Sequence, residues 1–146
     1  MPSFRVTRAV KHTPQQMYDL VADVERYPEF LPWCPRTAVL ERTPELTRAR
    51  IDVDYHGLKT SFSTRNAKRP PHAMTLELVE GPFESLAGEW RFEPLGDDGC
   101  RVELSLDYQA SGGALTALLA PVFGQIVETL VDRFVERAEN AAGGQR

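Results

Sequence analysis

The side chains that could act as nucleophiles, proton shuttles or metal ligands are few and scattered in this sequence. His12, His56 and His72 fall at expected strand ends or turns, where a solvent-exposed histidine is the common case. Neither Cys34 nor Cys100 belongs to a CxxC motif, and Cys34 follows a tryptophan in an apolar loop, which is typical of a buried thiol. GxSxG, HExxH and phosphate-binding glycine motifs are absent. We therefore expect no metal and no covalent cofactor.

Carboxylates are more numerous, but their spacing does not favour general acid–base catalysis. Five of them fall mostly on the polar side of alternating segments: Asp52, Asp54, Glu77, Glu89 and Glu103. A solvated sheet face explains this pattern, whereas a catalytic pair would have to point inward together. The sequence therefore predicts a binding protein and not an enzyme.

The segment 27–34 (YPEFLPWC) combines the prolines of a loop with an unusual amount of apolar area. A second apolar turn is expected at 81–83 (GPF). Aromatic rings without neighbouring acids or bases favour binding by burial over bond making. Two interpretations remain open, a plug at one end of the core or the mouth of a cavity for an apolar ligand. The residues expected at such a mouth are Tyr27, Phe30, Leu31, Trp33 and Phe83.

Positive charge gathers on the outward side of an expected hairpin at 46–66. Its cations share one parity: Arg48, Arg50, Lys59 and Arg65. Asp52 and Asp54 interrupt this patch, so cross-strand ion pairing on a wet face is one explanation. A local RNA-facing surface for phosphates is the other, and it agrees with the charge asymmetry of the chain. Residues 1–73 hold 12 Lys and Arg against 8 Asp and Glu, whereas residues 74–146 hold 5 against 13.

Two periodicities predict the elements that would position these groups. Residues 4–10 alternate as a strand, and Thr13 is expected to cap a short helix. Between residues 37 and 110 apolar residues recur with a period of two, separated by turns such as His56-Gly57, which indicates an antiparallel meander. Residues 118–135 carry two adjacent apolar rows at helical spacing, a stripe wider than a surface helix needs.

An antiparallel sheet that covers such a broad stripe is expected to curl around the helix. The predicted fold is α+β and of the helix-grip type, with about seven antiparallel strands around a long C-terminal helix and short helices after the first strand. The space between sheet and helix is either packed core or a ligand cavity. The residues expected to line a cavity are Phe62, Trp90, Phe92, Val122, Ile126, Leu130 and Phe134.

Length and composition agree with one globular domain, expected at 1–142 with a frayed tail at 143–146. The net charge of −4 disfavours DNA as a partner of the whole surface. There is no apolar run approaching the roughly 20 residues of a membrane span. The first residues lack the pattern of a secretion signal, so we expect a cytoplasmic protein.

The segment YPEFLPWC resembles the START-like family of coenzyme Q-binding proteins, which has a bacterial branch of ribosome association toxins. The similarity continues through 62–66 (FSTRN), 81–83 (GPF), 86–92 (LAGEWRF) and 131–138 (VDRFVERA), and thus covers nearly the whole chain in order. The resemblance implies a START-like helix-grip fold with a hydrophobic cavity. The wider superfamily also includes polyketide cyclases and lipid-transfer domains.

The resemblance implies two functions, of which the first is the one we expect and the second is the alternative. One is the binding of ubiquinone (coenzyme Q) or a similar polyprenyl lipid in support of respiration, with peripheral contact at the inner membrane for ligand exchange. The other is binding to the large ribosomal subunit, as a toxin that blocks subunit association. A cyclase or dehydratase enzyme is a third alternative, which rests on superfamily analogy alone.

Overall fold

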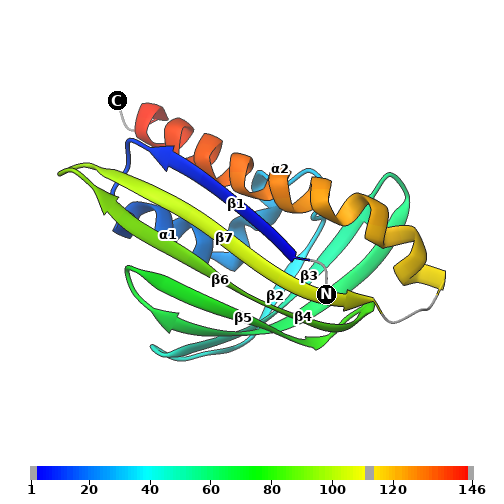
Figure 1. The fold of residues 1–146 in the computed structure, drawn as a ribbon. Helices are drawn as coiled ribbons and strands as arrows, with labels where there is room; N and C mark the ends of the chain where they lie inside the picture. The colour runs from blue at the N-terminus through cyan, green and yellow to red at the C-terminus, as the bar shows by residue number, and fades with distance from the viewer. Residues whose placement is uncertain (1–2, 111–113, 145–146) are drawn as a thin grey trace.

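The computed structural model describes residues 3–110 and 114–144, with the side chains of the last helix described from Phe123 to Asn140. One strand and two short helical segments come first, six further strands follow, and a long helix ends the fold (Figure 1). The elements are β1 (Ser3–Val10), α1 (Pro14–Ala22), the 3-10 helix η1 (Val24–Glu29), β2 (Thr37–Arg42), β3 (Leu46–Tyr55), β4 (Leu58–Arg69), β5 (Ala73–Glu80), β6 (Phe83–Leu95), β7 (Gly99–Ala110) and α2 (Ala114–Gly144).

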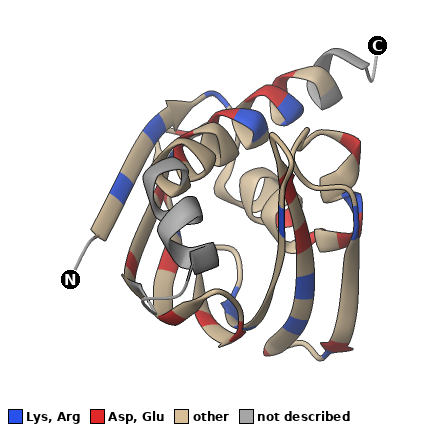
Figure 2. Ribbon diagram, turned by 90° about the vertical axis from the view of Figure 1, so that its right-hand side faces the viewer, with Lys and Arg blue, Asp and Glu red and all other residues tan. Residues whose placement is uncertain are grey.

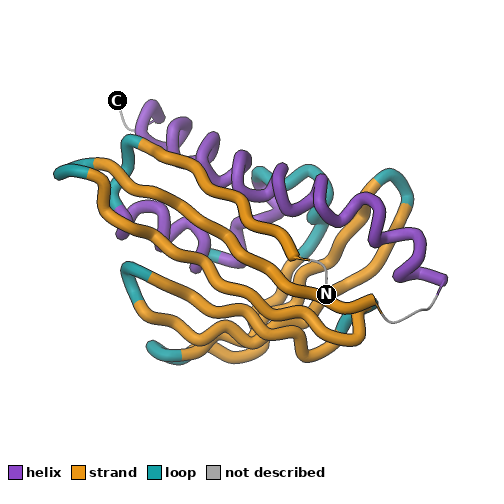
Figure 3. Tube along the Cα trace, in the orientation of Figure 1, coloured by secondary structure: helices purple, strands orange, loops and turns teal. Residues whose placement is uncertain are grey.

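All seven strands form one sheet in the order β1-β7-β6-β5-β4-β3-β2, and every neighbouring pair is antiparallel. The strands from β2 to β7 follow one another as a meander, because short turns can join only antiparallel neighbours. The sheet is strongly curved, and the helices lie on its inner side (Figure 3). The predicted α+β helix-grip architecture is therefore confirmed.

Local sequence explains how α1 and the β3–β4 hairpin form. The Thr13 hydroxyl accepts a hydrogen bond from the Gln16 backbone N–H, as expected for a cap, and the Gln16 side chain accepts one from the Thr13 N–H, which completes a capping box. His56 and Gly57 have φ angles of 52° and 86°, as a two-residue hairpin turn requires. This turn pairs Tyr55 with Leu58 and fixes the register of the whole hairpin.

Helix α2 packs across the inner side of the sheet and contacts α1, β1 and β7 (Figure 1). Its buried side chains repeat at helical spacing, so one stripe of the helix faces the sheet. They are Phe123, Ile126, Val127, Val131, Phe134 and Ala138. The helix continues through Gly144, and residues 145–146 of the expected tail lie outside the described residues. Among the described residues, none of the helices has the length and apolarity required to span a membrane.

Candidate functional site

The interior between sheet and α2 contains two clusters of aromatic rings. The first surrounds Phe134, whose ring centroid lies 5.3 Å from Tyr27, 5.2 Å from Phe30 and 5.5 Å from Trp90. Trp90 in turn stacks on Phe92 with centroids 6.0 Å apart. Phe134 and Phe92 are fully buried. Three residues predicted to line a cavity therefore meet two residues predicted at its mouth.

The second cluster surrounds Phe123, nearer the start of α2. Its ring centroid lies 4.9 Å from Phe83, 5.1 Å from Tyr108 and 6.3 Å from Phe62. Phe62 and Phe83 stack on each other at 5.9 Å, so a predicted lining residue and a predicted mouth residue lie together here. Phe4 also packs against Tyr108 and Phe123. The predicted set is thus divided between two sites along α2.

The remaining predicted lining residues are all on α2. Ile126 is buried, and Leu130 is half-buried against the core. The side chain of Val122 lies outside the described residues. Of the lining set, Trp90 contacts both Phe92 and Phe134, while Phe62 lies in the other cluster, so the predicted ligand cavity stays a prediction.

The predicted mouth segment is folded inward. Tyr27, Leu31 and Trp33 are buried, while Phe30 is half-buried. The Tyr27 hydroxyl donates a hydrogen bond to the backbone carbonyl of Val21, and burial raises the pKa of Tyr27. The segment therefore occupies the position of a plug at one end of the core, one of the two alternatives left open by the sequence.

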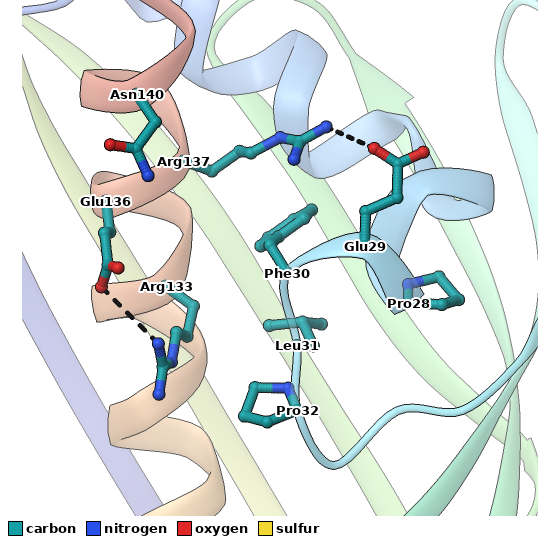
Figure 4. Close-up of a pocket in the computed structure, with 9 residues that line it drawn as sticks. All are labelled: Pro28, Glu29, Phe30, Leu31, Pro32, Arg133, Glu136, Arg137 and Asn140. Carbon is teal, nitrogen blue, oxygen red and sulfur yellow. Dashed lines mark hydrogen bonds and ion pairs between the residues drawn. The ribbon is translucent and has the colours of Figure 1, made fainter.

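A surface pocket of about 370 Å³ lies between this plug and α2 (Figure 4). Arg137 Nη2 donates to Glu29 Oε1 at 2.6 Å, and the guanidinium carbon of Arg137 lies 5.1 Å from the centroid of the Phe30 ring. Arg133 pairs with Glu136 at 3.7 Å on the neighbouring turn of the helix. The lining residues are Pro28, Glu29, Phe30, Leu31, Pro32, Arg133, Glu136, Arg137 and Asn140.

The sequence did not single out the polar side of this pocket. Arg137 follows Phe134 by three positions, so both lie on adjacent parts of one helix face, and this spacing was the available signal. The Arg137 side chain is only 28% exposed, because it covers Phe30.

The four predicted cations of the β3–β4 hairpin are all exposed, as their parity predicted. Register places Arg48 directly opposite Arg65 and Lys59 opposite Asp54. The two β3 arginines have ion pairs, Arg48 with Glu41 at 3.7 Å and Arg50 with Asp52 at 3.0 Å. Along β3 two basic positions are followed by two acidic ones, and Figure 2 marks basic positions in blue and acidic positions in red. Cross-strand pairing therefore accounts for part of the patch.

Strand β4 differs from β3 because it contains basic residues and no acidic one. Its cations are Lys59, Arg65, Lys68 and Arg69. Among the described residues none of the four has an ion pair within 4 Å, although Glu77 stands opposite Arg65 on β5. Burial, and then the charge of Arg42, lower the pKa of Lys68. Three of these four cations, Arg65, Lys68 and Arg69, thus lie within the last five residues of β4.

Catalytic chemistry has little support in the described interior. Apart from aromatic and cysteine side chains, the buried polar side chains among the described residues are Thr47 and Asn66, and neither is an acid or a base. Burial raises the pKa of both the Cys34 and the Cys100 thiol to about 11, so neither is an activated nucleophile at neutral pH. Within the described residues no group of three or more His, Cys, Asp or Glu is placed to hold a metal ion.

Comparison with known proteins identifies the class to which this fold belongs. Residues 10–135 match the family described as polyketide cyclase / dehydrase and lipid transport, and the chain belongs to this family. A START superfamily protein of known structure shares the arrangement of sheet and helix, which confirms the START-like fold. The family description spans both enzymes and lipid carriers, so it does not by itself specify an activity.

Relatives of higher sequence identity indicate more specifically where the chain belongs within this family. The chain is 42% identical to the "Ribosome association toxin RatA" of Pseudomonas aeruginosa, over 87% of this chain and 88% of that protein. It is 29% identical to the mitochondrial "Coenzyme Q-binding protein COQ10 homolog B" of Xenopus laevis, over 90% of this chain and 55% of that protein. Proteins of both branches named by the sequence resemblance are therefore related to the chain. The ribosome association toxin has the higher sequence identity of the two.

Structural similarity extends to an enzyme of the same fold. The crystal structure of the Zhui aromatase/cyclase from Streptomyces superimposes with a TM-score of 0.87, covering 97% of this chain and 95% of that one. The two sequences are 18% identical, so the similarity concerns the fold alone. The expectation that this chain is not an enzyme agrees with the names of its nearer relatives, and the fold itself allows either case.

Proposed function

We propose that this protein acts at the ribosome, binding the large subunit and opposing the association of the two subunits. The similarity to proteins named ribosome association toxins carries the proposal, since it extends over nearly the whole chain. The basic residues of β4 support it, because the ribosome presents RNA phosphates and these cations lack an ion pair among the described residues. Subunit joining would be blocked by occupation of the surface that the other subunit needs.

The opposed pair Arg48 and Arg65 adds a second argument. Like charges directly opposite each other on one face of a sheet destabilise it. The two arginines lie in a cross-strand row that runs from Glu41 through Arg48 and Arg65 to Glu77. The two glutamates offset this cost only at the ends of the row. A phosphate group bound between Arg48 and Arg65 would offset the repulsion between these two opposed guanidinium groups.

Co-sedimentation with purified large subunits at increasing salt tests the proposal. We expect the wild type to bind, and to lose affinity as salt rises because counterions are released on binding. The double variant Lys59→Glu/Arg65→Glu should no longer bind. The control variant Arg5→Glu/Arg101→Glu makes the same change of charge on β1 and β7, near the opposite edge of the sheet. It should bind like the wild type. Failure of the wild type to bind would overturn the proposal.

A second function, the binding of a hydrophobic small molecule such as ubiquinone, has its own support. The rings of Phe30, Phe134, Trp90 and Phe92 form a continuous aromatic path from the surface pocket into the core. Once the plug segment moves, an apolar ligand would bind along these rings by burying its apolar surface against them. The more distant similarity to a coenzyme Q-binding protein agrees with this.

Native mass spectrometry of protein purified from its own host tests this second function. A bound polyprenyl quinone should appear as a discrete mass increase that disappears when the protein is unfolded. Phe134→Ala removes the central ring of the path and should reduce the bound fraction. Protein that carries no lipid and takes up no added quinone would exclude this function while leaving the ribosomal one standing.

A further inference from the structure

One carboxylate on the outer face of the sheet holds two arginines at once. Asp52 Oδ2 accepts a hydrogen bond from Arg36 Nε at 3.1 Å, and Asp52 Oδ1 accepts one from Arg50 Nε at 3.0 Å. The Asp52 side chain is 15% exposed, whereas Arg36 is 81% and Arg50 is 54% exposed. The carboxylate therefore lies beneath two guanidinium groups that face solvent.

The backbone fixes the same arrangement. The N–H of Asp52 donates to the carbonyl of Arg36 at 3.0 Å, just before β2 pairs Thr37 with Ile51. The Cys34 thiol donates to that carbonyl as well, at 3.6 Å. Arg36 is thus held against β3 by its main chain and by its side chain, although it lies outside the regular part of β2.

The atoms used by Asp52 leave the ends of both arginines available. Each guanidinium binds the carboxylate through Nε, and among the described residues neither Arg36 nor Arg50 has a second side-chain partner for its Nη groups. A guanidinium held in one orientation loses less freedom when it binds a phosphate, and its Nη groups can donate to phosphate oxygens in pairs. Asp52 therefore orients two phosphate-binding forks on one surface.

A groove of about 530 Å³ lies beside these arginines. Lys59 adds a third cation to it, and Ser61, which is opposite Asp52 on the same face of the sheet, adds a hydroxyl donor. A second groove of about 310 Å³ lies next to it and is also lined by Arg36, Arg50 and Asp52. The three cations outnumber the two acids of the larger groove, Asp52 and Asp54, so the groove keeps a net positive charge.

We propose that Arg36, Arg50 and Lys59 form a binding site for the phosphodiester backbone of RNA, with Asp52 as the positioning residue. This deepens, and rests on, the proposed action at the ribosome. The open shape of the groove suits a backbone that passes across it, and hydroxyl donors beside cations are common in contacts to phosphate. Arg36 was not among the cations that the sequence predicted for an RNA-facing patch, because it does not belong to the alternating pattern of the hairpin.

Two substitutions with the same charge change give the decisive test. Asp52→Asn removes the negative charge and one of the two acceptor oxygens, so that at most one Nε group keeps its partner, and Asp54→Asn removes a neighbouring charge that pairs with neither arginine. If charge alone mattered, both variants would bind RNA more tightly than the wild type. If Asp52 orients the arginines, Asp52→Asn should bind about tenfold more weakly, a loss of about 1.4 kcal/mol, while Asp54→Asn binds equally well or better.

The measurement is fluorescence anisotropy of a labelled single-stranded RNA oligonucleotide with the full chain, with inorganic phosphate as competitor in a separate arm. Arg36→Gln should lower the slope of log affinity against log salt by about one, as expected for the loss of one phosphate contact. Circular dichroism and the urea midpoint confirm that each variant is folded. Competition by millimolar phosphate alone would identify the ligand as a free anion and overturn the RNA assignment.

The outcomes separate this site from the ribosomal proposal. Binding of the wild type to large subunits with no effect of Asp52→Asn or Arg36→Gln on RNA affinity would overturn the site and leave the ribosomal function standing. Loss of RNA affinity in these two variants, without any binding of the wild type to ribosomes, would support the site and overturn the ribosomal function. A wild type that binds neither RNA nor ribosomes overturns both.

Discussion

Arg137 in α2 donates a hydrogen bond to Glu29 at the end of η1, with 2.6 Å between Nη2 and Oε1 and 108 positions between the two residues in the chain. The same guanidinium lies over the ring of Phe30. The last helix therefore holds the plug segment through an ion pair and a cation–π contact together. Because Phe30 packs on Phe134, these contacts also cover the aromatic path into the core.

Arg137→Ala should destabilise the protein by about 1–2 kcal/mol, because it removes both contacts from a partly covered side chain. Arg133→Ala is the matched control. Arg133 is more exposed and has only a 3.7 Å pair with Glu136 on its own helix, so its loss should cost less than about 0.5 kcal/mol. Urea unfolding followed by circular dichroism measures both. Equal losses would contradict the special role of Arg137.

Phe134→Ala should cost about 3–5 kcal/mol, since it leaves a cavity where a fully buried ring meets three other rings. Phe30→Ala should cost clearly less, because Phe30 is only half-buried and its removal opens onto the surface pocket. The same urea titration compares the two variants. A larger loss for Phe30→Ala would show that the plug, and not the helix, holds the core together.

The elements of this fold follow from local rules, and the sequence was sufficient to predict them. Thr13 and Gln16 have the residue types and the spacing of a capping box at the start of a helix. His56-Gly57 forms a tight turn between two alternating segments. A period of two also determines which side chains point outward, so the exposure of Arg48 and Arg65 was predictable. These signals involve residues close together in the chain.

The sites depend on contacts that no local pattern contains. Periodicity predicted that Phe62 and Trp90 face the helix, but not that one packs near Phe123 and the other near Phe134, because position along α2 depends on how the sheet curves. Arg36 lies in a segment without periodicity, and its pairing with Asp52 arises only when β2 adds to β3. Such placements require the folded chain.

Gly88→Ala should destabilise the protein by about 2 kcal/mol or more, because a Cβ at position 88 would lie 2.2 Å from the backbone oxygen of Ser105 and 2.4 Å from Leu106 Cδ2. Gly81→Ala is the control. There the nearest atoms are Cδ1 of Leu78 and Cδ1 of Phe62, at 2.9 and 3.1 Å, so only side-chain atoms and no backbone must shift. Thermal unfolding distinguishes the two, and an equally tolerated Gly88→Ala would contradict the close approach of β6 and β7.

High pH should destabilise the protein through its two cysteines. Burial raises the pKa of Cys34 and of Cys100 from 9.0 to about 11, and the nearby charges of Asp52 and Glu93 act in the same direction. The unfolded chain releases these thiol protons from about pH 9, while the folded chain retains them up to about pH 11. Stability is therefore complete below pH 9 and declines as the pH rises from 9 to 11.

The urea midpoint at pH 8 and at pH 10 measures this decline, and Cys34→Ala/Cys100→Ala serves as the comparison. The double variant should lose less stability between the two pH values than the wild type, whatever its stability at pH 8, because the two thiol protons are absent from both of its states. The remaining decline belongs to tyrosines such as Tyr27, whose pKa burial also raises. Identical pH dependence in both proteins would show that the thiols ionise as readily in the folded chain as in the unfolded one.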